Sequence, residues 1–119
     1  MQYMLMCCFD ETLWANLPEA QKDKIMQEYS ELIQGIVKSG HFRGGAQLQP
    51  ISTSTTVRER NGKLITIDGP FAETKEQLGG YYLVECRDLD EAISIAARIP
   101  SVRVGGSIEV RPVLPGSQW

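Results

Sequence analysis

The residues with the widest chemical repertoire lie close together between positions 68 and 80. Asp68 and Glu73 are carboxylates that could act as proton acceptors, so we predict them as catalytic residues, and Lys75 could hold an anionic group. Phe71 stands inside this polar run, where its ring needs a pocket or an interface. The same residues also fit a structural turn, because Asp bonds its own downstream amides and the following Pro fixes φ. Both interpretations stay open at this point.

Further candidate ligand-binding residues stand outside this run. Arg58 and Arg111 could each grip a carboxylate or phosphate with two hydrogen bonds, or could instead pair across strands or across a dimer interface. Tyr81 and Tyr82 are neighbours in a predicted strand, so one ring enters the core and the other faces a cavity or a partner. Of the two, we predict that Tyr82 contacts the ligand. His41 is the single histidine and either caps a helix end or lines a pocket rim.

Composition excludes several classes of protein. The formal net charge is −3 and the pI is about 5.1, which predicts no nucleic-acid partner. No apolar run approaches the roughly 20 residues of a membrane span. Three cysteines form no disulfide framework and no metal-ligand spacing, so we expect reduced thiols in a cytoplasmic protein. One of them acting as a redox thiol is the alternative. The sequence shows no phosphate-binding glycine loop, no nucleophile elbow and no cluster of metal-ligand residues, so we predict neither metal nor cofactor.

Hydrophobic patterning predicts the elements that must position these groups. A strand over residues 3–9 is apolar on both faces, and a long amphipathic helix follows from Pro18 to Ser39, with Gly40 as its C-cap. The Asn61-Gly62 pair predicts a hairpin between strands at 51–58 and 64–67.

The C-terminal part of the chain predicts a second strand followed by a second helix, in the same order as at the N-terminus. A second strand apolar on both faces covers 79–86, and a second helix starts at an Asp88–Glu91 capping box and stops at Pro100. An alternating strand closes the chain at 107–113. The order β-α-β-β-β-α-β over a single domain, 1–119, predicts an α+β ferredoxin-like protomer, with its first and third main strands central in a four-stranded antiparallel sheet.

The two double-faced strands also predict a partner. Two helices cover only one face of such a sheet, so the other apolar face needs a second cover. A second copy of the chain is the simplest one, and it gives a homodimer with the sheets face to face.

At Asp68-Gly69-Pro70-Phe71 the chain resembles the YCII-related proteins, in particular the branch marked by an Asp-Gly-Pro-Phe motif. The resemblance extends over nearly the whole chain. It implies a dimeric α/β barrel of ferredoxin-like protomers. It also implies a genetic setting beside extracytoplasmic-function sigma factors, which makes a sigma factor a candidate partner. Other segments that carry it are Tyr3–Met6, Gly44-Gly45, Leu48–Pro50, Thr56–Arg58, Leu78–Tyr82, Asp90–Ala92 and Glu109–Val113.

The chain departs from the better-known YCII-like proteins in one respect. Those proteins carry a histidine in the first helix, paired with an aspartate, whereas residues 18–39 contain none. Their acid–base couple therefore does not transfer to this chain.

Two functional hypotheses follow. In the first, the homodimer binds a small organic ligand, or acts on it without a cofactor, near Asp68–Glu76. In the second, the chain is a regulatory accessory without catalysis that acts on a partner such as a sigma factor.

Overall fold

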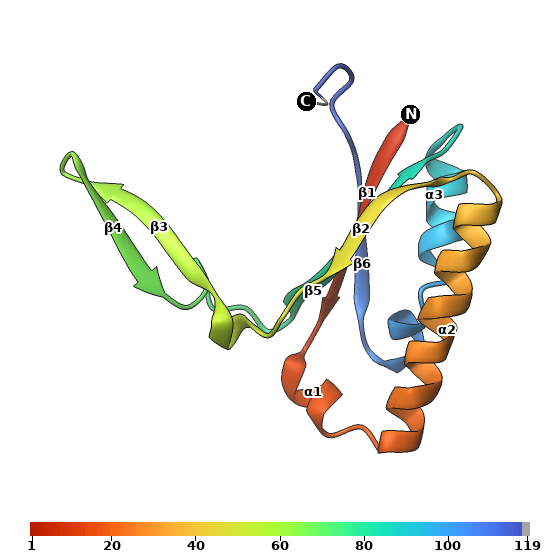
Figure 1. Ribbon diagram of the computed structural model, residues 1–119, viewed down its shortest axis with the longest axis horizontal. Coiled ribbons are helices and arrows are strands. Elements are labelled where there is room, and N and C mark those ends of the chain that lie inside the picture. Colours follow the sequence, from red (N-terminus) through yellow and green to blue (C-terminus); the bar gives the residue numbers. More distant parts are fainter. Residues whose placement is uncertain (118–119) are drawn as a thin grey trace.

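The computed structural model describes residues 1–117 as a mixed α+β structure made of a layered body and a projecting hairpin (Figure 1). Its helices and strands, in chain order, are β1 (Gln2–Phe9), α1 (Glu11–Ala15), α2 (Glu19–Lys38), β2 (Phe42–Gln47), η1 (Ile51–Thr53), β3 (Thr55–Arg60), β4 (Lys63–Asp68), β5 (Gln77–Glu85), α3 (Leu89–Ala96), η2 (Pro100–Val104) and β6 (Ser107–Pro112).

The main sheet contains four antiparallel strands in the order β2-β5-β1-β6. This order, with a helix after β1 and another after β5, is that of the ferredoxin-like plan. The two strands that the sequence marked as apolar on both faces, β1 and β5, are the central ones, as predicted. The alternating final strand, β6, lies at an edge, which was also predicted.

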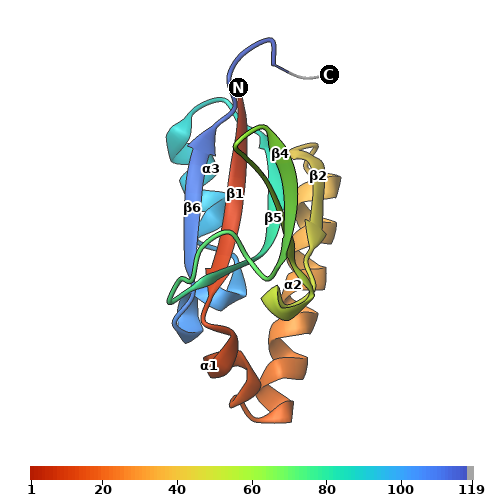
Figure 2. The same cartoon turned by 90° about the vertical axis from the view of Figure 1, so that its left-hand side faces the viewer.

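Helices α2 and α3 both pack against one face of the main sheet (Figure 2). The hydrophobic core lies between them and that face. Alternate residues of β1 and β5 enter the core, because successive strand side chains point to opposite faces. The core residues are Tyr3, Leu5, Leu32, Ile36, Tyr82, Val84, Cys86, Ala92, Ile95, Ala96 and Ile99.

The ends of the helices follow the signals in the sequence. Pro18 lies just before the first residue of α2 rather than inside it, and its carbonyl accepts the amides of the first turn. Gly40 adopts φ +82°, so the amides of Gly40 and His41 close the helix on Val37 O and Ile36 O in a Schellman motif. Asp88 caps α3 by accepting the amide of Glu91, as predicted.

The second strand of the main sheet was missing from the sequence prediction. Residues 42–47 form β2, which pairs with β5, although a Gly-Gly-Ala run has low strand propensity. Pairing with the central strand β5 outweighs that local preference. The run predicted as one strand at 51–58 divides into the short helix η1 and the strand β3. The short helix α1 was not predicted either.

The hairpin formed by β3 and β4, which we call the arm (residues 55–68), stands apart from the main sheet. Its turn is the predicted Asn61-Gly62 pair, with φ of +53° and +77°. Neither strand pairs with the main sheet. The radius of gyration is 16.2 Å, whereas a compact chain of 119 residues has a radius of about 13.5 Å. The arm therefore extends well beyond the body.

Within residues 1–117, no helix is long and apolar enough to cross a membrane.

Candidate functional site

The face of the main sheet turned away from α2 and α3 has no helix over it, and we call it the open face (Figures 1 and 2). Met4 and Leu83 are cross-strand partners there, as are Met6 and Tyr81. All four side chains are only partly buried in the single chain. Other residues of this face, given by strand register, are Cys8, Gly44, Ala46, Leu78, Glu109 and Arg111.

Polar groups gather where β1 ends on the open face. Burial raises the pKa of the Cys8 thiol, and the charges of Glu76 and Glu109 raise it further. Arg111 forms an ion pair with Glu109. Glu76 Oε1 is buried, and no group in residues 1–117 donates a hydrogen bond to it. This end of the face therefore holds a neutral thiol beside a carboxylate oxygen that lacks a donor.

The thiols are poorly suited to nucleophilic chemistry. Cys7 points into the core side of β1, where burial raises its pKa to about 12. Cys8 and Cys86 also have raised pKa values, chiefly through burial. Because the thiolate is the nucleophilic form, these cysteines stay protonated near neutral pH.

The segment that joins the arm to β5 is held by its own hydrogen bonds. Thr56 Oγ1 donates to Gly69 O at 2.8 Å, and Arg58 Nη2 donates to Phe71 O at 3.3 Å. Further along, Gln77 Nε2 donates to Thr74 O at 2.6 Å. These contacts hold the first part of the segment against the base of the arm. They also fix the end of the segment, which contains Glu76, at the start of β5.

The structure brings together some of the predicted site residues. Arg58, Asp68 and Phe71 lie around the base of the arm, with Phe71 77% exposed. The Asp68 carboxylate has no hydrogen bond or ion pair to residues 1–117, so the predicted turn bond from its side chain is not made. Glu73 and Lys75 follow in the exposed part of the segment.

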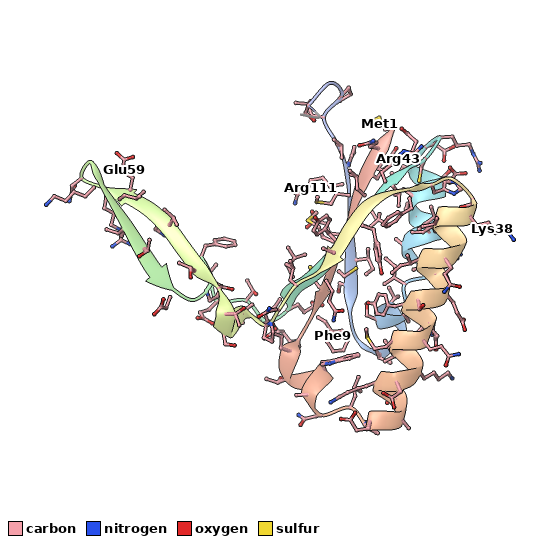
Figure 3. All side chains as sticks on the ribbon, in the orientation of Figure 1. Met1, Phe9, Lys38, Arg43, Glu59 and Arg111 are labelled. Atoms are coloured by element: carbon pink, nitrogen blue, oxygen red, sulfur yellow. The ribbon has the colours of Figure 1, made fainter. Side chains whose placement is uncertain are left out.

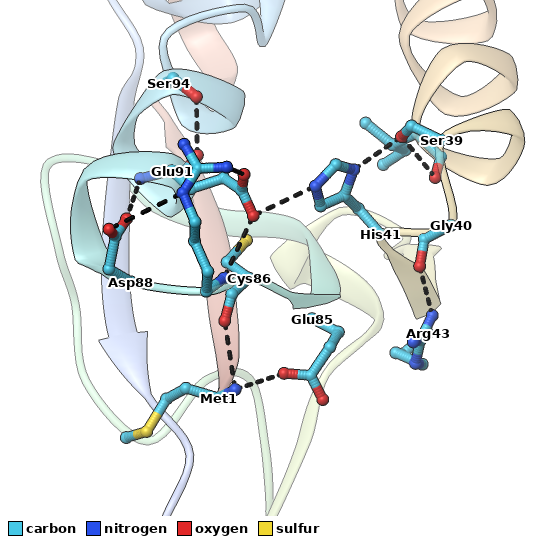
Figure 4. Close-up of polar contacts among 12 residues, drawn as sticks. Met1, Ser39, Gly40, His41, Arg43, Glu85, Cys86, Asp88, Glu91 and Ser94 are labelled. Atoms are coloured by element: carbon cyan, nitrogen blue, oxygen red, sulfur yellow. Dashed lines mark hydrogen bonds and ion pairs between the residues drawn. The ribbon is translucent and has the colours of Figure 1, made fainter.

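Tyr82 and His41 lie away from this group. The Tyr82 ring is in the core, 8% exposed, and burial raises the pKa of its hydroxyl. Its neighbour Tyr81 is the tyrosine on the open face. His41 lies at the other end of the body, beyond the C-terminus of α2 (Figure 4).

His41 belongs to a second polar cluster, which joins α2 to α3. The Schellman turn directs its ring between the helices, where Nδ1 lies 2.6 Å from Ser39 Oγ and Nε2 lies 3.2 Å from Glu91 Oε1 (Figure 4). Glu91 also accepts the Arg87 amide at 3.1 Å and forms an ion pair with the Arg87 guanidinium. Ser39 Oγ contacts Ile36 O at 3.2 Å. The described contacts use every member of this cluster to fix the helix ends.

We expect the ionised Glu91 carboxylate to stabilise the fold and this contribution to be lost at acid pH. The Arg87 amide, the Arg87 charge and His41 hold the pKa of Glu91 below its ordinary value. A carboxyl group whose pKa is lower in the folded state stabilises the fold above its unfolded pKa, and this contribution is lost as pH falls through the folded value. Thermal unfolding between pH 6 and pH 3, taken as a rough window around carboxyl titration, should show a steeper loss of Tm in wild type than in Glu91→Gln. Equal slopes in both proteins would contradict this role.

Sequence reasoning missed the polar groups around Cys8 and the His41–Glu91 contact. Glu76 and Glu109 are far apart in the sequence, and only the three-dimensional packing brings both charges close enough to Cys8 to raise the pKa of its thiol. The capping-box position of Glu91 was the one available signal for its role.

Comparison with known proteins identifies the family of the chain. The model of the YCII-related domain matches residues 1–117. Uncharacterized protein R00369 of Rhizobium meliloti (strain 1021) is 37% identical over 114 residues, which cover 95% of this chain and 92% of that protein. The chain therefore belongs to the YCII-related family.

Proposed function

We propose that the chain binds a small organic molecule on the open face, at the end bordered by Glu76, and that a second copy of the chain covers this face. Within the family, the Asp68-Gly69-Pro70-Phe71 sequence supports placing the chain in the branch that carries this motif. No metal or organic cofactor enters the proposal.

The need for a cover comes from the apolar character of the open face. Met4, Met6 and Leu83 lie on the two central strands, where a solvent-facing sheet would carry polar side chains. Apolar patches of this kind mark interaction surfaces. A two-fold dimer places the same patch on both sides of the interface, so each copy covers the other. Two such protomers form the dimeric barrel that the family resemblance implies.

The observation that carries ligand binding is the buried Glu76 Oε1 without a donor. A buried acceptor left unpaired costs about 1–3 kcal/mol, so a donor from a bound molecule would stabilise the site. The neighbouring thiol and the methionines favour an apolar ligand body. The ligand that fits is therefore a small, largely apolar molecule with a hydroxyl or amine.

The residues at the base of the arm would form the entrance. Phe71 offers an exposed ring, Arg58 and Lys75 offer cations, and Asp68 offers an exposed carboxylate. Catalytic roles for Asp68 and Glu73 stay predictions. The sigma-factor partner and the cytoplasmic location also stay predictions, since no described feature bears on them.

A ligand screen by thermal shift tests the proposal, with small aromatic and aliphatic alcohols, phenols and amines as probes. A ligand at 100 times its Kd adds about 2.7 kcal/mol to the free energy of unfolding, which is several degrees in Tm. We expect Glu76→Leu to lose this shift, since it removes the acceptor, and Asp68→Ala to reduce it. Asp23→Asn, a change of an exposed carboxylate on α2, is the matched control and should retain the full shift.

Two results would contradict the proposal. One is that no probe raises the Tm of wild type. The other is that a probe raises the Tm of wild type and Glu76→Leu equally, which would place its binding elsewhere.

A further inference from the structure

The arm carries apolar side chains that residues 1–117 leave largely exposed. Val57 is 58% exposed and Leu64 is 73% exposed. A two-stranded hairpin is at best marginally stable in water without a third strand or a packing surface. Among the strands of residues 1–117, the arm pairs with no other. It therefore needs a surface to pack against.

The two faces of the arm differ, as its register shows. Pairs Thr56–Ile67, Arg58–Ile65 and Arg60–Lys63 share one face, which the chain partly covers through the contacts of Thr56 with Gly69 and of Arg58 with Phe71. Within the described residues, no side-chain hydrogen bond or ion pair joins the opposite face to the rest of the chain. It holds the pairs Thr55–Asp68, Val57–Thr66 and Glu59–Leu64, and we call it the uncovered face of the arm.

The uncovered face of the arm is turned toward the region in front of the main sheet. The arm projects from the side of the sheet opposite α2 and α3 in both ribbon views (Figures 1 and 2). Glu59 lies on the inner side of the arm, toward the main sheet (Figure 3). Val57 and Leu64 share that face by register. Arg111 of the open face points into the same region (Figure 3).

We propose that the arm packs its uncovered face, through Val57 and Leu64, against a second copy of the chain seated on the open face. This inference rests on the proposed dimer and adds a second contact surface to it. The region between the arm and the open face is where that copy would lie. Two-fold symmetry then gives the dimer two arms, each reaching around the other protomer.

The dimensions of the arm fit this arrangement. Six residues in each strand give a length of about 20 Å. Face-to-face sheets lie about 10 Å apart, and a helix layer lies about 10 Å beyond. The arm is thus long enough to pass the sheet of the second copy and reach its helix layer.

Charge also favours a second copy over nucleic acid. The uncovered face of the arm carries two carboxylates, Glu59 and Asp68, and no cation, because Arg58, Arg60 and Lys63 lie on the opposite face. Phosphate groups are therefore repelled from the face that holds Val57 and Leu64. A nucleic acid would contact the cationic face, with Arg58, Arg60 and Lys63, and would leave Val57 and Leu64 uncovered.

Sedimentation and amide hydrogen exchange test the arm in the full chain. The variant Val57→Thr/Leu64→Thr keeps good strand formers but removes the aliphatic surface. We expect its dimer Kd to rise at least about tenfold, because the variant removes two aliphatic side chains from the apolar contact with the second copy. In wild type, arm amides should exchange at least about tenfold more slowly well above the dimer Kd than well below it.

The matched control is Leu13→Thr/Val37→Thr, on α1 and α2, where the side chains are 49% and 54% exposed. It should leave the Kd unchanged, and protection of β1 and β5 amides shows that each variant is folded. Two outcomes would contradict the arm proposal and leave the proposed dimer standing. In the first, wild type dimerises but its arm amides exchange equally fast at both concentrations. In the second, the arm variant keeps the wild-type dimer Kd. A wild type that stays monomeric overturns both. The arm proposal would also be wrong if a DNA duplex slowed amide exchange in the arm and a high protein concentration did not.

Discussion

Leu83→Glu should convert the protein from a dimer into a monomer. Leu83 lies on central strand β5, opposite Met4, and its side chain faces away from the helices. In a two-fold dimer with open faces in contact, the substitution buries one carboxylate from each copy in the same apolar interface. Like charges brought together in this way cost several kcal/mol, which corresponds to at least about a thousandfold weaker association. The protomer itself should still fold, because this face is not part of its own core.

Sedimentation at micromolar concentration measures this effect. Wild type should sediment at twice the protomer mass of 13.3 kDa, and Leu83→Glu at the protomer mass. Val37→Glu adds the same charge to an exposed position on α2 and should remain dimeric. A Leu83→Glu protein that still dimerises would show that the contact lies on another surface.

The fold was largely predictable because its signals are local and repeated. Apolar residues on both faces identified β1 and β5 as central strands, and cap residues such as Asp88 placed the helix ends. Strand β2 was missed since pairing with β5, rather than its own composition, makes it a strand. The sequence also did not show that the arm forms a two-stranded sheet separate from the main sheet. An Asn-Gly turn predicts a hairpin, but it does not determine which strands the hairpin joins.

The candidate site was predictable only in part. The sequence analysis singled out residues 68–76 as a candidate site. The structure places Arg58, Asp68 and Phe71 together at the base of the arm. The sequence analysis chose Tyr82 as the ligand contact, whereas the structure places the Tyr82 ring in the core. Alternation shows only that adjacent tyrosines face opposite sides of a sheet, and it does not show which of them faces the core. The meeting of Glu76 with Cys8 depends on a shift of register between β1 and β5 near Cys8. The extra residue of this bulge is Gly79, and a glycine within a strand is a local signal for a bulge that the sequence analysis did not use.

Leu5→Ala and Met6→Ala should separate the two faces of the sheet within one strand. Leu5 is 0% exposed beneath the helices, whereas Met6 lies on the open face and is partly buried. Leu5→Ala leaves a cavity in the core of each protomer, which costs about 2–5 kcal/mol whatever the protein concentration. Met6→Ala removes surface that, in our proposal, is fully buried only in the dimer. Its cost should therefore grow with protein concentration.

Thermal unfolding below and well above the dimer Kd distinguishes these cases. Leu5→Ala should lower the Tm by roughly 10 °C at both concentrations, given about 3–6 °C per kcal/mol for a chain of this size. Met6→Ala should change the Tm little at the low concentration and lower it clearly at the high one, because dimer formation stabilises the folded state by mass action. If the Met6→Ala loss is the same at both concentrations, the open face is not covered by a second copy. Its methionines would then belong to a surface that another partner or the ligand alone covers.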